Sequence, residues 1–297
     1  MSRDFLNLPQ EEAGGPEAPY LILPVPYEQT VSYGRGCARG PAAIIAASAE
    51  VEPFDEELET EPYRVGIGTL DYEEVTAAGP EAMVKALERR VAPLAKVGKT
   101  VITLGGEHSI TPGPVRAYQK LNLDLSVLQI DAHADLRDGY QDCRYSHASA
   151  MMRVRDTVGV TVGVGIRNLS RPEFDYYRST PDCHLAFAFQ RDPAGQWINE
   201  AIDHLTPNVY VTIDLDGLDP SIMPAVGTPE PGGLAYEEVL AVLRRVTLRR
   251  HVVGADVVEL APIGGQHAPD FVAARLTYKL ISYIERGRRA VRRDQKG

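Results

Sequence analysis

Hydrophobic residues recur along the chain in short continuous runs that have the length of β-strands. Most runs show little alternation with polar residues, which indicates strands buried on both faces, as in a parallel sheet covered by helices. The predicted strands are residues 20–25, 100–104, 125–130, 158–166, 209–213 and 252–258.

Helical patterns lie between several of these strands. The apolar residues of 81–92 and of 236–246 recur every three or four positions and so mark one side of a helix. Alternating strands and helices predict a three-layer α/β/α fold with a mostly parallel sheet. No linker, repeat or low-complexity segment divides the chain. We therefore expect a single domain over residues 1–297.

The charge balance excludes one class of partner. The 297 residues carry 31 Lys and Arg against 41 Asp and Glu, a net charge of −10, whereas binding a nucleic-acid backbone requires a basic surface. No apolar run approaches the roughly 20 residues that a membrane helix needs, and no secretion signal is visible. With three widely spaced cysteines, the sequence predicts a cytoplasmic protein with reduced thiols, no nucleic-acid partner and no membrane partner.

Ionisable residues follow four of the predicted strands within a few positions. His108 comes after residues 100–104, Asp131 after 125–130, Asp214 after 209–213 and Glu259 after 252–258. In an open parallel sheet the ligand crevice lies outside the carboxyl ends of the strands. We therefore expect these four strand ends to converge on one site.

The spacing within two of these segments favours a metal centre. Asp131, His133 and Asp135 alternate and so project to one side of an extended chain, as do Asp214 and Asp216. Four carboxylates in a half-buried place repel one another unless cations offset them. Two divalent ions carry four positive charges, which match the four carboxylates. A ligand set of carboxylates and imidazoles favours Mn²⁺ over softer ions.

The sequence resembles the ureohydrolase (arginase/agmatinase) family, and most closely a bacterial agmatinase. The segments that carry the resemblance are 105–109 (GGEHS), 131–135 (DAHAD) and 214–220 (DLDGLDP), supported by GRG at 34–36, GP at 40–41 and GIR at 165–167. The family implies an eight-stranded α/β/α fold, two manganese ions per subunit and a cytoplasmic trimer or hexamer. Residues 1–297 would then be one ureohydrolase domain.

The resemblance also implies a role for each site residue. One manganese would be held by His108, Asp131, Asp135 and Asp214, and the other by Asp131, His133, Asp214 and Asp216. Asp135 would also transfer a proton from the attacking water to the leaving amine, Glu259 would bind the guanidinium, and His147 would shuttle protons at the mouth of the site.

The substrate expected from the resemblance is agmatine, which would yield putrescine and urea in polyamine biosynthesis. Residues 136–147 resemble the loop of bacterial agmatinases, and Ser170 replaces the acid that arginases place three residues after the arginine of GIR. The alternatives are 4-guanidinobutyrate or arginine as substrate, a zinc deacetylase of similar fold with one metal, or a relative without enzyme activity.

Overall fold

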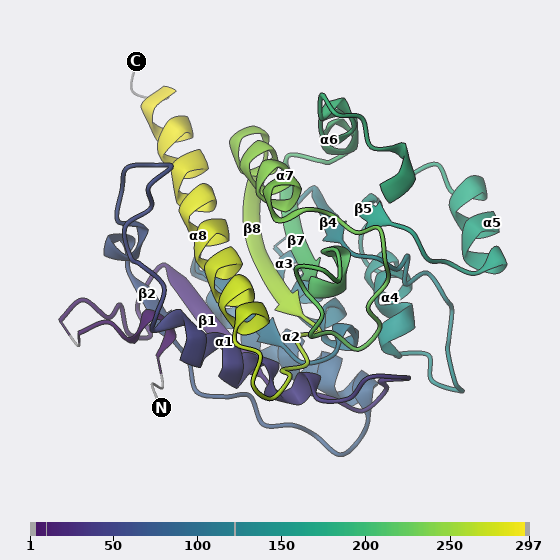
Figure 1. Cartoon of the computed structure of the whole chain (residues 1–297), viewed down its shortest axis with the longest axis horizontal. Coiled ribbons are helices and arrows are strands. Elements are labelled where there is room, and N and C mark those ends of the chain that lie inside the picture. Colours follow the sequence, from purple (N-terminus) through teal and green to yellow (C-terminus); the bar gives the residue numbers. More distant parts are fainter. Residues whose placement is uncertain (1–3, 10, 122, 295–297) are drawn as a thin grey trace.

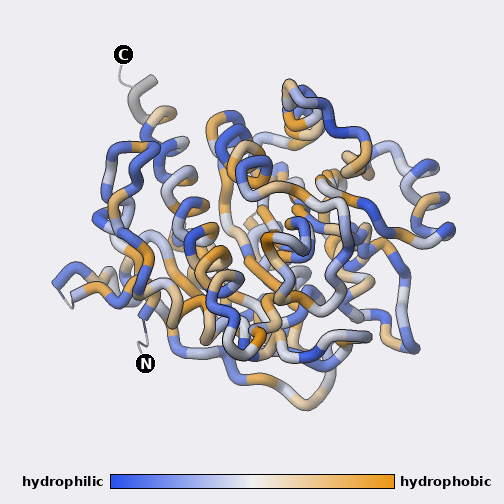
Figure 2. Tube along the Cα trace, in the orientation of Figure 1, coloured by the Kyte–Doolittle hydropathy of each residue, from blue (hydrophilic) through white to orange (hydrophobic). Residues whose placement is uncertain are grey.

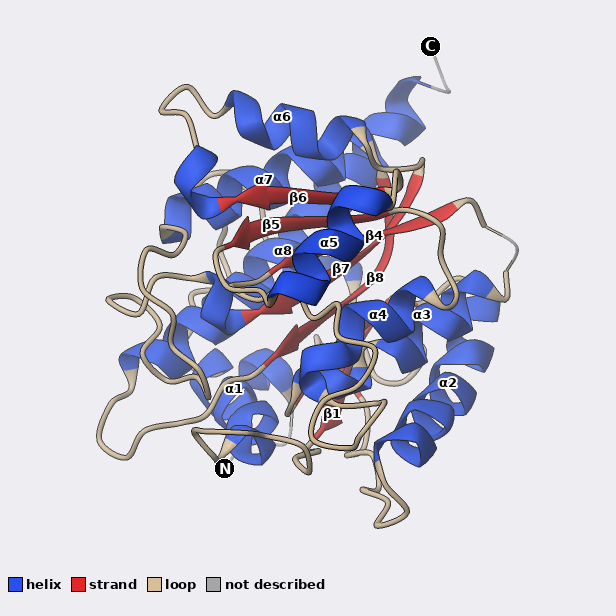
Figure 3. Ribbon diagram, turned by 90° about the vertical axis from the view of Figure 1, so that its right-hand side faces the viewer, coloured by secondary structure: helices blue, strands red, loops and turns tan. Residues whose placement is uncertain are grey.

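One sheet of eight strands lies between two layers of helices in the computed structural model, which describes residues 4–9, 11–121 and 123–294 (Figures 1 and 3). All neighbouring strands run parallel, in the order β2-β1-β3-β8-β7-β4-β5-β6. The strands are β1 (Tyr20–Val25), β2 (Ile67–Thr69), β3 (Thr100–Gly105), β4 (Leu125–Ile130), β5 (Thr161–Ile166), β6 (Cys183–Phe187), β7 (Asn208–Asp214) and β8 (His251–Val258). The predicted α/β/α fold is confirmed.

The main helices pack as two groups, one on each face of the sheet. Helices α1, α6, α7 and α8 share one buried cluster with the sheet, and α2, α3 and α4 share the other, with α5 at its margin. Figure 2 shows the hydrophobic residues gathered along the central strands. The helices are α1 (Gly40–Ser48), α2 (Pro80–Lys96), α3 (Pro112–Gln119), α4 (Ala150–Arg155), α5 (Arg171–Ser179), α6 (Gln196–Asp203), α7 (Tyr236–Arg249) and α8 (Ala268–Asp294).

The six strands predicted from apolar runs are all present. The largest difference is at β5, which begins at Thr161 rather than at residue 158. The reason is that the N–H of Val158 donates to the carbonyl of Val154 and so continues the turn that ends α4. β2 and β6, the two edge strands, were not among the predicted elements.

The sheet order brings the four strands with polar ends side by side. β3, β8, β7 and β4 are consecutive neighbours in the middle of the sheet. Because all four run in the same direction, the residues that follow them meet at one edge. In a parallel α/β sheet, ligand sites lie at this carboxyl edge.

Candidate active site

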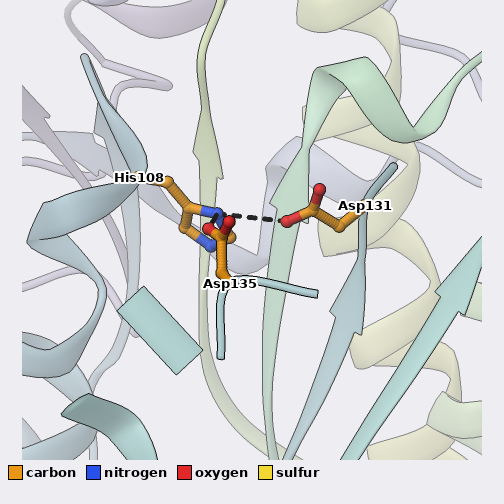
Figure 4. Close-up of side chains that lie close together, drawn as sticks. All are labelled: His108, Asp131 and Asp135. Atoms are coloured by element: carbon orange, nitrogen blue, oxygen red, sulfur yellow. Dashed lines mark ion pairs between the residues drawn. The ribbon is translucent and has the colours of Figure 1, made fainter. Parts of the chain in front are cut away.

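His108 faces three carboxylates at the carboxyl edge of the sheet. It opens a short 3-10 helix (His108–Ile110) after β3, and it is buried. Its Nδ1 lies 3.2 Å from Asp131 Oδ2, 3.1 Å from Asp135 Oδ2 and 3.3 Å from Asp214 Oδ2. Figure 4 shows His108, Asp131 and Asp135 pointing toward one another. Nδ1 nevertheless makes no hydrogen bond among the described residues.

The opposite nitrogen of His108 is fixed by two residues of the sheet. Nε2 lies 2.9 Å from Thr212 Oγ1, and the Thr212 hydroxyl donates to Asp256 Oδ1 at 2.5 Å. Since the only proton of that hydroxyl goes to Asp256, Oγ1 accepts the Nε2 proton of His108. A neutral His108 therefore turns an Nδ1 lone pair toward the carboxylates, which is the arrangement of a metal-binding histidine held by an outer partner.

A second group of metal-type ligands shares Asp131 with the first. Asp131, His133 and Asp216 bring ligand atoms within 4.8 Å of one another, as do His108, Asp131 and Asp135. His133 Nδ1 lies 2.9 Å from Asp216 Oδ2. Asp214 lies beside both groups, because its Oδ2 faces His108 and its Oδ1 accepts the Asp216 N–H at 2.9 Å.

The electrostatics of the cluster favour a bound cation. Burial raises the pKa of Asp135 to about 7, and the charge of Asp131 adds to the effect. Burial also raises the pKa of Asp214 well above its usual range, together with the charges of Asp216 and Asp131. These carboxylates cannot all be ionised in a buried place unless positive charge is placed among them. The donor set of carboxylate and imidazole therefore fits divalent metal ions.

Glu259 follows β8 and contacts the first ligand directly. Its Oε1 accepts the backbone N–H of His108 at 2.7 Å. Burial raises its pKa to about 8. Glu259 and Asp135 both have positive φ, 69° and 53°, a conformation that non-glycine residues adopt rarely and that clusters at functional sites.

His147 lies on a separate loop that joins the same cavity. Its Nδ1 is 3.2 Å from Thr30 Oγ1 and its Nε2 is 3.4 Å from Ser32 Oγ. The Tyr140 ring lies edge-on, with centroids 6.0 Å apart. Burial lowers the pKa of His147 to about 4.

The predicted site residues converge on one cavity of about 190 Å³. It is lined by His108, His133, Asp135, His147, Asp214, Asp216 and Glu259, and Asp131 is buried beside His108. The cavity wall also includes Arg137, Tyr140, Asn168 and Thr228, which the sequence analysis did not assign to the site.

Glu107 is a buried residue that the sequence analysis quoted but did not interpret. Its carboxylate accepts the N–H groups of Gln29 and Thr30, both at 2.6 Å, and the hydroxyls of Thr30 and Ser109. Glu107 thereby anchors the loop that contacts His147. A charged residue directly before His108 in GGEHS was the available signal.

The arginine of GIR and the aspartate before Pro220 have structural contacts. Arg167 donates to the carbonyls of Gly165, Asp216 and Glu230, and so braces the loop after β7. Asp219 accepts the Ser221 N–H and the N–H groups of Gly232 and Gly233. Asp219 therefore closes this loop and lies outside both groups of ligands.

Comparison with known proteins places this geometry in a family. The model of the arginase family matches residues 18–282. The chain belongs to the arginase family. Within that family it is 41% identical to an N(1)-aminopropylagmatine ureohydrolase of Synechocystis sp., over 90% of this chain and 89% of the relative. It is 31% identical to an agmatinase of Pyrococcus horikoshii, over 91% and 93%.

Solved structures agree with the arginase-family assignment. The agmatine ureohydrolase of Thermoplasma volcanium superposes with a TM-score of 0.84 at 32% identity, covering 96% of this chain and 95% of that one. The predicted family and fold are therefore confirmed, and the match argues against the deacetylase alternative. Among the described residues, no helix has the length and apolar character needed to cross a membrane.

Proposed function

We propose that this arginase-family protein is a dinuclear manganese ureohydrolase that releases urea from a linear guanidine with an amine at its far end. The observation that carries the proposal is the convergence of six metal-type side chains beside Glu259, five of which line one cavity. The family supports hydrolysis as the reaction class.

The proposed metal ligands follow from the two groups of side chains. His108, Asp131, Asp135 and Asp214 would hold one ion, and Asp131, His133, Asp214 and Asp216 the other. The geometry supports this division because Asp131 belongs to both groups and Asp214 contacts a member of each. Carboxylates and imidazoles without thiolates favour Mn²⁺. Two such ions would lower the pKa of a water and neutralise the carboxylates.

The residues of the chain supply binding and proton transfer. Glu259 binds the planar guanidinium by paired hydrogen bonds, a geometry in which charge-assisted bonds are strongest. Asp135 takes the proton of the attacking water and gives it to the nitrogen whose bond to the guanidinium carbon breaks. His147, which lines the same cavity, passes protons between Asp135 and solvent. The products are urea and the free amine.

We propose N(1)-aminopropylagmatine as the preferred substrate. The support is the relative from Synechocystis sp., which bears that name and is 41% identical over nearly the whole chain, whereas the agmatinase is 31% identical. Agmatine is the second candidate, because residues 136–147 resemble the loop of bacterial agmatinases and Ser170 stands in place of an acid. Both compounds carry an amine four carbons from the guanidinium.

Urea release from a panel of guanidines tests the proposal. Protein loaded with Mn²⁺ would be assayed with N(1)-aminopropylagmatine, agmatine, 4-guanidinobutyrate and arginine. We expect the highest kcat/KM for N(1)-aminopropylagmatine, then agmatine, and far lower values for the two guanidines with a carboxylate. Preference for arginine or 4-guanidinobutyrate would contradict the substrate, and no urea from any compound would contradict the function.

A further inference from the structure

Glu230 lies beside the cavity and has no role in the mechanism described above. Its Oε2 accepts a hydrogen bond from Asn168 Nδ2 at 2.9 Å, and Asn168 lines the cavity. The backbone of Asn168 is itself fixed, because its N–H donates to Ala132 at 3.0 Å and its carbonyl accepts from Ala134 at 3.2 Å. Glu230 is thus held next to the segment that carries Asp131 and Asp135.

The backbone of Glu230 is also fixed. Its carbonyl accepts from Arg167 Nε at 3.1 Å and from Nη2 at 2.7 Å. Pro229 and Pro231 flank it and restrict the local backbone. Arg167 thus bonds the carbonyl of Glu230, and the carboxylate bonds Asn168.

The Glu230 carboxylate lies beside this wall without a cation from the described residues in direct contact with it. Within the described part of the chain it makes no ion pair, and Asn168 is its hydrogen-bonding partner. On the wall itself, Arg137 and Glu173 carry opposite charges that offset one another. Arg137 Nε lies 3.7 Å from Glu173 Oε2. Arg137 also lies over the Tyr140 ring, 5.0 Å from its centroid. Glu230 therefore adds a carboxylate beside a wall on which Arg137 and Glu173 pair with each other.

Glu230 and Glu259 both lie near one segment of the cavity wall. Gly227 lines the cavity beside Glu259, since a Cβ on Gly227 would lie 3.8 Å from Glu259 Oε2. From Gly227 to Glu230 the chain advances three residues, at most about 11 Å. Thr228, between them, also lines the cavity. The segment from Gly227 to Glu230 thus has the Glu259 carboxylate beside its first residue and the Glu230 carboxylate on its last.

We propose that Glu230, positioned by Asn168 and Arg167, determines specificity by binding the ammonium group that lies four carbons from the guanidinium. The inference rests on the proposed function. It gives the protein one carboxylate for each end of the substrate. It also predicts discrimination against guanidines with a carboxylate at that end, because two carboxylates brought together repel.

The test compares three guanidines that differ at the far end: agmatine with an ammonium, n-butylguanidine with a methyl, and 4-guanidinobutyrate with a carboxylate. In the manganese-loaded holoenzyme, Glu230→Gln should raise KM for agmatine and lower its kcat/KM about fivefold, the effect of one partly exposed ion pair. The same variant should leave n-butylguanidine unchanged and improve 4-guanidinobutyrate. Glu230→Asp, which keeps the charge, should retain most of the preference for agmatine.

Glu200→Gln is the matched control, because it removes the same charge from an exposed position on α6. It should change none of the three values. An equal loss on agmatine and n-butylguanidine in Glu230→Gln would assign Glu230 a structural role and overturn the inference, as would no change on agmatine. If the unmodified enzyme releases urea from N(1)-aminopropylagmatine but from none of the three, the inference about Glu230 is overturned and the proposed function stands; if it releases urea from none of the four, the proposed function is wrong as well.

Discussion

The carboxylate of Glu259 is joined directly to the backbone of His108, whose N–H donates to Glu259 Oε1 at 2.7 Å. The group proposed to bind the guanidinium is therefore fixed relative to a proposed metal ligand. The contact crosses between the ends of β3 and β8, which are neighbours in the sheet. Sheet register thus sets the position of Glu259 relative to this proposed ligand.

Replacing Glu259 by Gln separates guanidinium binding from metal binding. The amide oxygen can still accept the His108 N–H, so metal content should be unchanged. The paired charge-assisted bonds to the substrate are lost, which costs about 3 kcal/mol and so lowers kcat/KM about 100-fold. Urea release and metal analysis of the same sample measure both effects. Unchanged kcat/KM would contradict the proposed role of Glu259.

Replacing Thr212 by Val tests the outer contact of the metal centre. The Nε2 proton of His108 and the carboxylate of Asp256 both lose a partner. We expect Mn²⁺ affinity to fall 10- to 100-fold, the usual effect of losing such a contact (about 1–3 kcal/mol). Competition with a metal-binding dye measures the affinity. Thr212→Ser keeps the hydroxyl and should bind normally, and equal affinity in Thr212→Val would show that the hydroxyl does not orient His108.

The sequence predicted those parts of the molecule whose signals are local. The buried strands β1 and β4 were predicted with their observed ends, because continuous apolar runs mark strands buried on both faces. β6 was missed because most of its residues are half-exposed at the sheet edge, and β2 because it has only three residues. The ligand-type residues were found because each follows a strand.

Other site residues were not predictable from local pattern. Thr212 and Asp256 lie within buried strands, where a polar residue has no distinctive spacing. Asn168 and Glu230 are 62 residues apart and meet only because β5 and the loop after β7 are brought together by the sheet and by Arg167. Tertiary contact, not sequence spacing, creates this part of the cavity.

Asp219 should stabilise the loop that carries Thr228 and Glu230 in a pH-dependent way. Hydrogen bonds from the Ser221 side chain and backbone, and then from Gly233 and Gly232, lower the pKa of Asp219 to about 2. A pKa lowered by folding gives stabilisation that is full above the unfolded value of about 4 and is lost as the pH falls through the folded value. The carboxylate therefore contributes fully at pH 7.

Asp219→Asn should lower Tm by a few degrees at pH 7, because an amide nitrogen would face the Gly232 and Gly233 donors. The difference in Tm between Asp219→Asn and the unmodified protein should become smaller as the pH falls from 4 toward 2. Thermal unfolding over a pH series measures it, with Glu200→Gln as a control whose small effect should not vary. A difference that stays constant down to pH 3 would contradict the contribution of the charge.

Metal titration tests the central claim most directly. Protein stripped with a chelator would be titrated with Mn²⁺ while bound metal per chain and urea release from agmatine are measured. We predict that activity is absent at the start and saturates at two ions per chain. Asp131→Asn should lose both ions and activity, and Asp124→Asn, at the opposite end of β4, should match the unmodified protein. Full activity without metal, or normal binding of two ions by Asp131→Asn, would contradict a dinuclear centre bridged by Asp131.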